Sequence, residues 1–289
     1  MISDRVSVDD ARSPDHGDGP TGFDSDELPV SNVGEPELVV LASPGEVVRE
    51  SADRIAAALI GAVASRGRAD MCTTGGSTVI PIYRLLSASP RCATIPWSRV
   101  HVWWGDDRFV PRGHPDSNVT LLDCVLVGDD RAPLPAANVH PFPVSRALAD
   151  GRDSAWCAAS YAGEMAAVLR CGAGNWPVFD LVIVGVGYDG HVLSCFPDSP
   201  ALDSPAWALA IPAPTQIGPH IGRVTLNPRV LEASPVVAIA WGRAKAPTLG
   251  SIFGPVRDDR RWPAQRLRRP GATWLVDEAA ARTISRERV

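Results

Sequence analysis

The stretch Gly185-Val-Gly-Tyr-Asp-Gly-His191 carries the residue types best suited to acid–base chemistry in this chain. Its glycines allow a sharp turn and a close approach to a ligand, while Asp189 and His191 place a carboxylate near an imidazole, a combination common in general acid–base catalysis. The same residues also suit a simpler structure, in which Asp189 and Gly190 form a turn and His191 caps or packs against the next helix. The other motifs of the chain bear on this choice.

A second glycine-rich segment, Thr73-Thr-Gly-Gly-Ser-Thr78, is suited to holding a phosphate group. Gly75 and Gly76 expose backbone N–H groups, the helix expected to start here adds partial positive charge, and the hydroxyls of Ser77 and Thr78 can donate hydrogen bonds. A plain N-cap by Ser77 or Thr78 would explain the same residues. The segment matches neither the six-position dinucleotide fingerprint nor the GxxxxGK[ST] loop, so both interpretations stay open.

Two carboxylates and an arginine stand together in Asp106-Asp107-Arg108, directly after an expected strand. Arg108 can grip a phosphate with two parallel N–H donors, and Asp106 or Asp107 can orient it or contact sugar hydroxyls. A surface salt bridge of little consequence would look the same in the sequence. Ser117, further along, is expected to cap a helix.

Further cations lie in Arg223-Val-Thr225 and Gly242-Arg-Ala-Lys245. Lys245 is the only lysine among 28 basic residues, which favours a place where a compact ammonium works and a planar guanidinium does not, although a lysine on a solvated face is the alternative. With Arg108, we expect Arg223 and Lys245 to form an anion clamp at separate strand ends of one sheet.

Short apolar strands alternate with helical patterns between these motifs, which predicts an α/β fold with a mostly parallel sheet. In such a sheet, ligands bind beyond the carboxyl ends of the strands, where the motifs fall. We expect strands at residues 38–41, 69–73, 100–104, 179–184, 236–241 and 273–276, and helices at residues 47–63, 78–87, 117–124, 155–170 and 228–233 and from residue 244.

The composition is that of an ordinary globular protein, with 289 residues, 45% hydrophobic and 21% charged. We predict a disordered tail over residues 1–35 and a single α/β catalytic domain over residues 36–289. The net charge of -5 argues against nucleic acid as a partner. No apolar stretch or leader-like N-terminus indicates a membrane partner, so we expect a cytoplasmic protein. The six cysteines form no CxxC pair, and no metal site is expected.

Taken in order, the motifs resemble those of the 6-phosphogluconolactonase family over about residues 37–276. The resemblance implies a three-layer fold with a mostly parallel, Rossmann-like sheet and helices on both faces, as in the sugar-phosphate isomerases and deaminases. Asp107 departs from the family's usual Glu, and Tyr188 from a common Pro. The matching segments are Gly75-Gly-Ser-Thr78, Asp106-Asp-Arg-Phe-Val-Pro111, Asp116-Ser-Asn118, Gly185-Val-Gly-Tyr-Asp-Gly-His-Val-Leu-Ser-Cys-Phe-Pro197, Arg223-Val-Thr225 and Gly242-Arg-Ala-Lys245.

The resemblance implies hydrolysis of 6-phospho-D-glucono-1,5-lactone to 6-phosphogluconate in the pentose phosphate pathway, without a redox cofactor or an obligatory metal. The substrate is a small phosphosugar lactone, and the oligomeric state stays open. His191 is the expected base, and Asp189 is expected to orient it. The residues expected to bind the substrate and its phosphate are Gly75, Gly76, Ser77, Thr78, Asp106, Arg108, Arg223 and Lys245.

Two other functions remain as alternatives. The chain is also similar, less closely, to glucosamine-6-phosphate deaminases, whose motif reads nearer to D-E-Y at residues 106–108 and carries a glutamate where this chain has Cys195-Phe-Pro-Asp198. Proton abstraction beside a carbonyl needs that carboxylate, whereas lactone hydrolysis needs only activated water. A non-catalytic sugar-phosphate sensor would keep the pocket, but His191 favours an enzyme.

Overall fold

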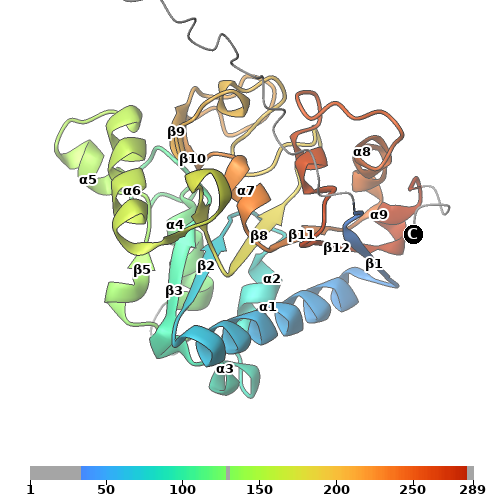
Figure 1. Cartoon of the computed structure of the whole chain (residues 1–289), viewed down its shortest axis with the longest axis horizontal. Coiled ribbons are helices and arrows are strands. Elements are labelled where there is room, and N and C mark those ends of the chain that lie inside the picture. The colour runs from blue at the N-terminus through green and yellow to red at the C-terminus, as the bar shows by residue number, and fades with distance from the viewer. Residues whose placement is uncertain (1–33, 128–130, 285–289) are drawn as a thin grey trace, which may run out of the picture. The chain divides into compact units, whose positions relative to one another are not determined.

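A seven-stranded sheet forms the centre of the computed structural model, which describes residues 34–127 and 131–284 (Figure 1). The strand order is β1-β12-β11-β8-β2-β3-β5, and neighbouring strands in it are parallel. Helices lie on both sides of the sheet, which confirms the predicted three-layer, mostly parallel α/β fold. Of the tail predicted at residues 1–35, all but the last two residues lie outside the described part.

The predicted strands and helices all form, with ends that shift by a few residues. None of the helices described here is long and apolar enough to cross a membrane. The strands of the sheet are β1 (Glu37–Leu41), β2 (Ala69–Thr73), β3 (Val100–Trp104), β5 (Val139–His140), β8 (Leu181–Gly185), β11 (Val236–Ala240) and β12 (Ala272–Asp277). The α-helices are α1 (Pro44–Arg66), α2 (Ile80–Leu86), α3 (Arg91–Thr94), α4 (Asn118–Leu122), α5 (Val144–Ala149), α6 (Ser154–Val168), α7 (Arg229–Ala233), α8 (Ala246–Ile252) and α9 (Glu278–Ala281).

Local signals at both ends define the long helix α1. The side chain of Ser43 accepts a hydrogen bond from the amide of Glu46, Pro44 occupies the first turn, and Gly67 ends the helix with a φ of 73°. Apolar residues at helical spacing, including Ile55 and Leu59, are fully buried. The helix runs along the sheet (Figure 1). Its apolar side chains form the buried face.

The order in which strands are added to the sheet reverses between β2 and β8, two parallel strands that lie side by side at the middle of the sheet. From β2 the sheet grows through β3 to β5, and from β8 it grows the other way through β11 to β12. The segments that leave the carboxyl ends of β2 and β8 therefore diverge and leave a crevice between them, the usual ligand site of an open α/β sheet.

A second, three-stranded antiparallel sheet corrects one expectation. It consists of β4 (Asp106–Arg108), β10 (Arg223–Leu226) and β9 (Ala208–Ile211), with Arg223 directly opposite Arg108. The prediction that Arg223 lies at a strand end of the central sheet is therefore wrong. The four residues of β10 do not reveal which strand they pair with, because a short buried strand fits a parallel or an antiparallel sheet equally well.

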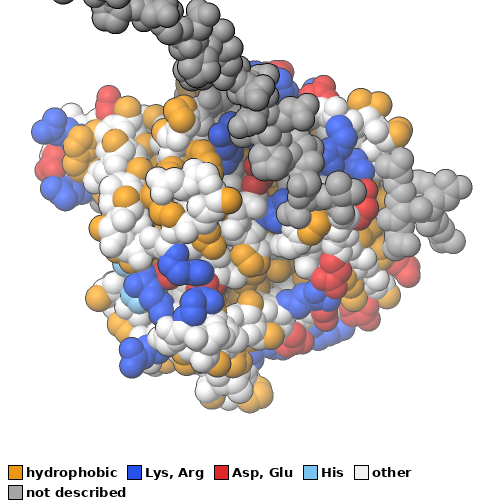
Figure 2. Space-filling model, in the orientation of Figure 1, with side chains coloured by type: hydrophobic (Ala, Val, Ile, Leu, Met, Phe, Trp, Pro, Cys, Tyr) orange, Lys and Arg blue, Asp and Glu red, His pale blue; other side chains and the backbone are white. Residues whose placement is uncertain are grey.

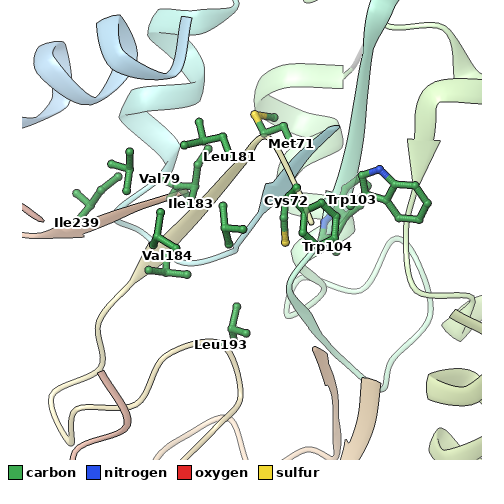
Figure 3. Close-up of a cluster of buried hydrophobic side chains, with 14 of the residues drawn as sticks. Met71, Cys72, Val79, Trp103, Trp104, Leu181, Ile183, Val184, Leu193 and Ile239 are labelled. Carbon is green, nitrogen blue, oxygen red and sulfur yellow. The ribbon is translucent and has the colours of Figure 1, made fainter. Parts of the chain in front are cut away.

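The hydrophobic core reaches from the central sheet to the segment that follows residue 191. Figure 3 shows side chains of β2, β3, β8 and β11 packed together, with Leu193 beyond the strand ends. Leu193 is buried and lies so close to Gly105 that a Cβ there would come within 2.6 Å of its Cδ2. This contact anchors the segment after His191 to the end of β3.

Tyr161 links α6 to the sheet, and its hydroxyl should contribute to stability. The fully buried hydroxyl accepts a hydrogen bond of 2.9 Å from the amide of Trp104 and lies 3.1 Å from the carbonyl oxygens of Trp104 and His140. Tyr161→Phe should lower the free energy of unfolding by about 1–3 kcal/mol in urea denaturation, because buried polar groups lose their partner. Tyr188→Phe, at a residue that is 61% exposed, should change it by less than about 0.5 kcal/mol. Equal losses in both variants would contradict this role.

Candidate active site

A solvent-open pocket of about 180 Å³ lies at the carboxyl ends of β2, β3 and β8. It occupies the crevice where the strand order reverses, and it brings together three motifs that are far apart in the sequence. The predicted site residues that line it are Gly75, Gly76, Ser77, Thr78, Asp106, Arg108 and His191; the rest of its lining is Thr74, Asn118, Gly185, Val186, Gly187 and Leu193.

His191 and Asp189 form a close pair in the loop of residues 185–191, which we call the histidine loop. Nδ1 of His191 and Oδ1 of Asp189 share a hydrogen bond of 2.5 Å, and the backbone amide of His191 donates to the same oxygen at 3.2 Å. Burial raises the pKa of Asp189, but its hydrogen bonds and the charge of His191 outweigh this effect and bring the pKa below its usual value. Since Nδ1 faces the carboxylate, Nε2 is the nitrogen left for chemistry.

The alternative in which His191 serves a neighbouring helix is wrong. In the described chain the residues directly after His191 form turns, and the next helical element is the short 3-10 turn at Pro200–Leu202. The imidazole instead lies against Phe196, with ring centroids 4.8 Å apart, and its side chain stays 20% exposed at the pocket. His191 is therefore held on one edge and accessible on another.

The close pair requires glycine at position 187. A Cβ added to Gly187 would overlap Nδ1 of His191 and come within 2.5 Å of Oδ1 of Asp189. The loop also closes on itself, because the amide of Gly187 donates to the carbonyl oxygen of His191 at 2.9 Å. The absence of a side chain at residue 187 is thus a steric condition for the hydrogen bond between imidazole and carboxylate.

The glycine loop after β2 does not serve as a helix cap. Helix α2 begins at Ile80, its N-cap is Val79, and among the described residues no side chain caps it with a hydrogen bond. The alternative that Ser77 or Thr78 merely caps this helix is therefore wrong, and both residues line the pocket. Their hydroxyls and the neighbouring backbone are placed where a ligand can reach them.

Asp106 and Arg108 both line the pocket, and each side chain is held by a hydrogen bond. Asp106 is buried, and its Oδ2 accepts a hydrogen bond of 2.7 Å from Ser194 Oγ. Nη1 of Arg108 donates to the carbonyl oxygen of Asp116 at 2.6 Å, which holds the guanidinium while other N–H donors remain. Together they give the pocket one anionic and one cationic wall.

Asp107 ties the end of β4 to the start of α4. Its Oδ1 accepts hydrogen bonds from the backbone amides of Arg108 at 2.8 Å and Asn118 at 2.6 Å. Burial raises the pKa of Asp107 to about 6, although these hydrogen bonds oppose the shift. Ser117 caps α4 as predicted, accepting from the amides of Val119 and Thr120. The carboxylate that is shorter than the family's glutamate thus finds backbone partners.

Arg223 and Lys245 lie outside the pocket lining. Arg223 is 3% exposed, and its Nη2 donates to the carbonyl oxygen of Pro219 at 2.8 Å. Its buried Nη1 has no hydrogen-bond partner among residues 34–127 and 131–284. Burial and the charge of Arg108 lower its pKa. Nζ of Lys245 donates to the carbonyl oxygen of Val186 at 2.6 Å and lies 3.6 Å from the ring centroid of Tyr188, and burial lowers its pKa to about 8. Of the three expected clamp cations, Arg108 alone reaches the lining.

Asn118 lines the pocket but was not among the residues predicted to bind the substrate. It is 2% exposed, and its Nδ2 donates to the carbonyl oxygen of Asp106 at 2.9 Å. Its position in the Asp116-Ser-Asn118 motif was the available signal, but the capping role of such residues explained the motif equally well. The Asn118 side chain is bonded to β4 and packs so closely on the glycine loop that a Cβ on Gly75 would overlap its Oδ1.

The fold and the pocket define a class of protein, an α/β protein that places an imidazole, carboxylates, an arginine and a glycine-rich loop at the switch point of a parallel sheet. A model of the family described as glucosamine-6-phosphate isomerases/6-phosphogluconolactonase matches residues 42–276. Because this match covers most of the chain, the chain belongs to that family.

Individual relatives agree with this assignment. The chain is 31% identical over 253 residues to a 6-phosphogluconolactonase of Synechocystis sp., covering 86% of this chain and 98% of the relative. It is 33% identical over 257 residues to the 6-phosphogluconolactonase of Streptomyces coelicolor, covering 87% and 95%. The crystal structure of 6-phosphogluconolactonase from Leishmania guyanensis superposes with a TM-score of 0.74 at 26% identity, covering 86% and 99%. A monomeric glucosamine-6-phosphate deaminase has a TM-score of 0.70 at 14% identity and shares the fold.

Gly187→Ala should separate His191 from Asp189, because the added methyl group needs the space that Nδ1 occupies. A crystal structure of the variant should show the Nδ1–Oδ1 distance beyond the hydrogen-bonding range of about 3.2 Å. Gly185→Ala is the matched control in the same loop, since a Cβ there meets nothing within 4 Å. An intact Asp189–His191 bond in Gly187→Ala would show that the loop tolerates a side chain at this position.

Proposed function

We propose that this protein hydrolyses 6-phospho-D-glucono-1,5-lactone to 6-phospho-D-gluconate, the second step of the oxidative pentose phosphate pathway. The observation that carries the proposal is that His191, paired with Asp189, lines the same pocket as Arg108. Relatives that are 31% and 33% identical over most of the chain are named 6-phosphogluconolactonase. An acid–base group and a phosphate-binding cation in one pocket are what a phosphorylated lactone requires.

Arg108 and the loop of residues 75–78 hold the phosphate in this proposal. The guanidinium offers planar N–H donors, and the loop offers backbone amides and hydroxyls. Arg223, opposite Arg108, and Lys245, beside Val186, add positive potential from outside the lining. Holding the phosphate away from the reacting carbon fixes the lactone carbonyl near His191, which removes much of the entropic cost of the reaction.

His191 then acts as the base. Nε2 takes a proton from water while the water oxygen bonds to the lactone carbonyl carbon, and the negative charge moves to the carbonyl oxygen. When the carbonyl re-forms, the bond to the ring oxygen breaks, and the imidazolium returns its proton to that oxygen. Asp189 accepts from Nδ1 throughout and stabilises the positive ring. The acid product loses a proton to solvent, so the protein ends in its starting state.

Deamination is disfavoured by the segment Cys195-Phe-Pro-Asp198, where deaminases carry a glutamate. The carboxylate of this segment, Asp198, is exposed and lies outside the pocket lining. Here Cys195 is fully buried, and burial raises the pKa of its thiol to about 12, so it does not exchange protons near pH 7. Ser194 is also unsuited to act as a nucleophile, because its buried hydroxyl donates to Asp106. Water activated by His191 remains the simplest source of the attacking oxygen.

Replacement of His191 tests the proposal directly. His191→Ala should hydrolyse freshly generated 6-phosphogluconolactone about 10²- to 10⁴-fold more slowly, the usual contribution of a general base. The assay couples 6-phosphogluconate formation to its oxidation and subtracts the spontaneous opening of the lactone. Calorimetry should show that the variant still binds 6-phosphogluconate. The wild type should turn over phosphate-free gluconolactone poorly and release no ammonia from glucosamine 6-phosphate; unchanged hydrolysis in His191→Ala would remove this residue as the base.

Lys245 predicts a pH dependence of ligand binding. Because its pKa is lowered to about 8, the ammonium is present at pH 7 and is lost as the pH rises through 8. The affinity for 6-phosphogluconate should then fall by up to about tenfold between pH 7 and 9, because about nine tenths of the Lys245 charge beside the pocket is lost by pH 9. Lys245→Arg keeps its charge over this range and should bind with an affinity that barely changes with pH. A flat wild-type profile in calorimetry would argue against a role for the Lys245 charge.

A further inference from the structure

Alternate carbonyl groups of the histidine loop are held from outside by the part of the chain that follows β11. The three donors come from different positions, one at the start of α8, one within it and one in the 3-10 helix Pro263–Leu267. The bonds run from Lys245 Nζ to the Val186 oxygen at 2.6 Å, from Thr248 Oγ1 to the Tyr188 oxygen at 2.6 Å, and from the Ala264 amide to the Gly190 oxygen at 2.9 Å.

Two of these bonds fix the peptide planes that lead into the acid–base pair. The Tyr188 carbonyl belongs to the peptide joined to Asp189, and the Gly190 carbonyl belongs to the peptide joined to His191. A peptide unit is planar, so fixing its carbonyl limits the direction in which the next side chain leaves the backbone. The bonds inside the loop, from the Gly187 amide to His191 and from the Gly190 amide to Gly187, do not use the Tyr188 carbonyl.

Thr248 is well placed to hold this carbonyl rigidly. It is 5% exposed and lies in α8, and its β-branched side chain has few rotamers in a helix. Thr248 is buried and its bond to the Tyr188 carbonyl is partly buried. When the hydroxyl is lost, the carbonyl therefore has to reorient to find a new partner. Reorientation of the peptide turns the carboxylate of Asp189, which sets the direction of the imidazole of His191.

We propose that Thr248 is a positioning residue for His191, which acts through the Tyr188 carbonyl and Asp189. Its effect on turnover rests on the proposed lactone hydrolysis, whereas its effect on the geometry of the pair does not. Thr248 lies outside the pocket lining, so the loss of its hydroxyl should disturb orientation and leave ligand contacts in place.

The test compares Thr248→Val, which keeps the shape and removes the hydroxyl, with Thr248→Ser, which keeps the hydroxyl. Thr283→Val is the matched control, because Thr283 Oγ1 donates to the carbonyl oxygen of Ala246 on the same helix without reaching the histidine loop. In Thr248→Val, kcat should fall about 10- to 100-fold, the range expected for a misplaced catalytic group. KM should stay within about twofold. Thr248→Ser should restore most of kcat, and Thr283→Val should leave it within about twofold of wild type.

A spectroscopic readout separates this proposal from the function of the pocket. Proton NMR of histidine-labelled protein, assigned with His191→Ala, should show a hydrogen-bonded Nδ1 proton of His191 in the wild type and in Thr283→Val. In Thr248→Val this signal should weaken or exchange faster. An unchanged signal and unchanged kcat in Thr248→Val would overturn the proposal, as would a loss in kcat that Thr248→Ser fails to rescue. If the wild type did not hydrolyse the lactone but the NMR differences appeared, the positioning role would stand and the proposed function would fail.

Discussion

A short hydrogen bond between two residues only two positions apart, Asp189 and His191, determines the shape of the backbone around it. Both the ring Nδ1 and the backbone amide of His191 point to one carboxylate oxygen, so the chain must fold tightly between them. That fold leaves no space for a side chain at Gly187, and it exposes alternate carbonyls that donors outside the loop must satisfy. The orientation of one imidazole therefore depends on α8 and the turn beyond it as much as on the loop itself.

The two arginines of the small sheet, Arg108 and Arg223, bring like charges close together. Arg108 and Arg223 face each other across an antiparallel pair, an arrangement of like charges that is unfavourable by itself. Within the part of the chain that the structure describes, the buried Nη1 of Arg223 has no hydrogen-bond partner. Burial lowers the pKa of Arg223, and the charge of Arg108 adds to this effect. Nearby carboxylates, including Asp106 and Asp116, offset part of this cost. A bound anion would offset more, which fits a phosphorylated ligand. On the face shown in Figure 2, by contrast, basic and acidic side chains are interspersed.

The sequence predicted those elements whose own residues identify them, but not the pairings between segments that are far apart in the chain. The strands Ala69–Thr73 and Val100–Trp104 were predicted with the bounds that the structure has, because each is a short, mostly buried run between turn signals. The strand Asp106–Arg108 gives no such signal, since three charged residues in a row resemble a loop. Its pairing with β10 joins residues more than a hundred positions apart, so the close approach of Arg223 to Arg108 could not be read locally. Thr248, which lies outside the pocket lining, had no distinguishing motif in the sequence.

The contacts of Lys245 in the structure account for the presence of a single lysine in the sequence. A chain that otherwise uses arginine keeps one lysine where Nζ fits between the Val186 carbonyl and the face of Tyr188. A compact ammonium can donate to a carbonyl and lie close over a ring at once, whereas a planar guanidinium spreads its donors in a wider fork. Since Val186 belongs to the histidine loop, this group supports the loop and carries a charge beside the pocket. Any ligand that draws Lys245 toward its phosphate must also weaken or reshape a bond to the loop that orients His191, so ligand binding and the position of the base are physically coupled.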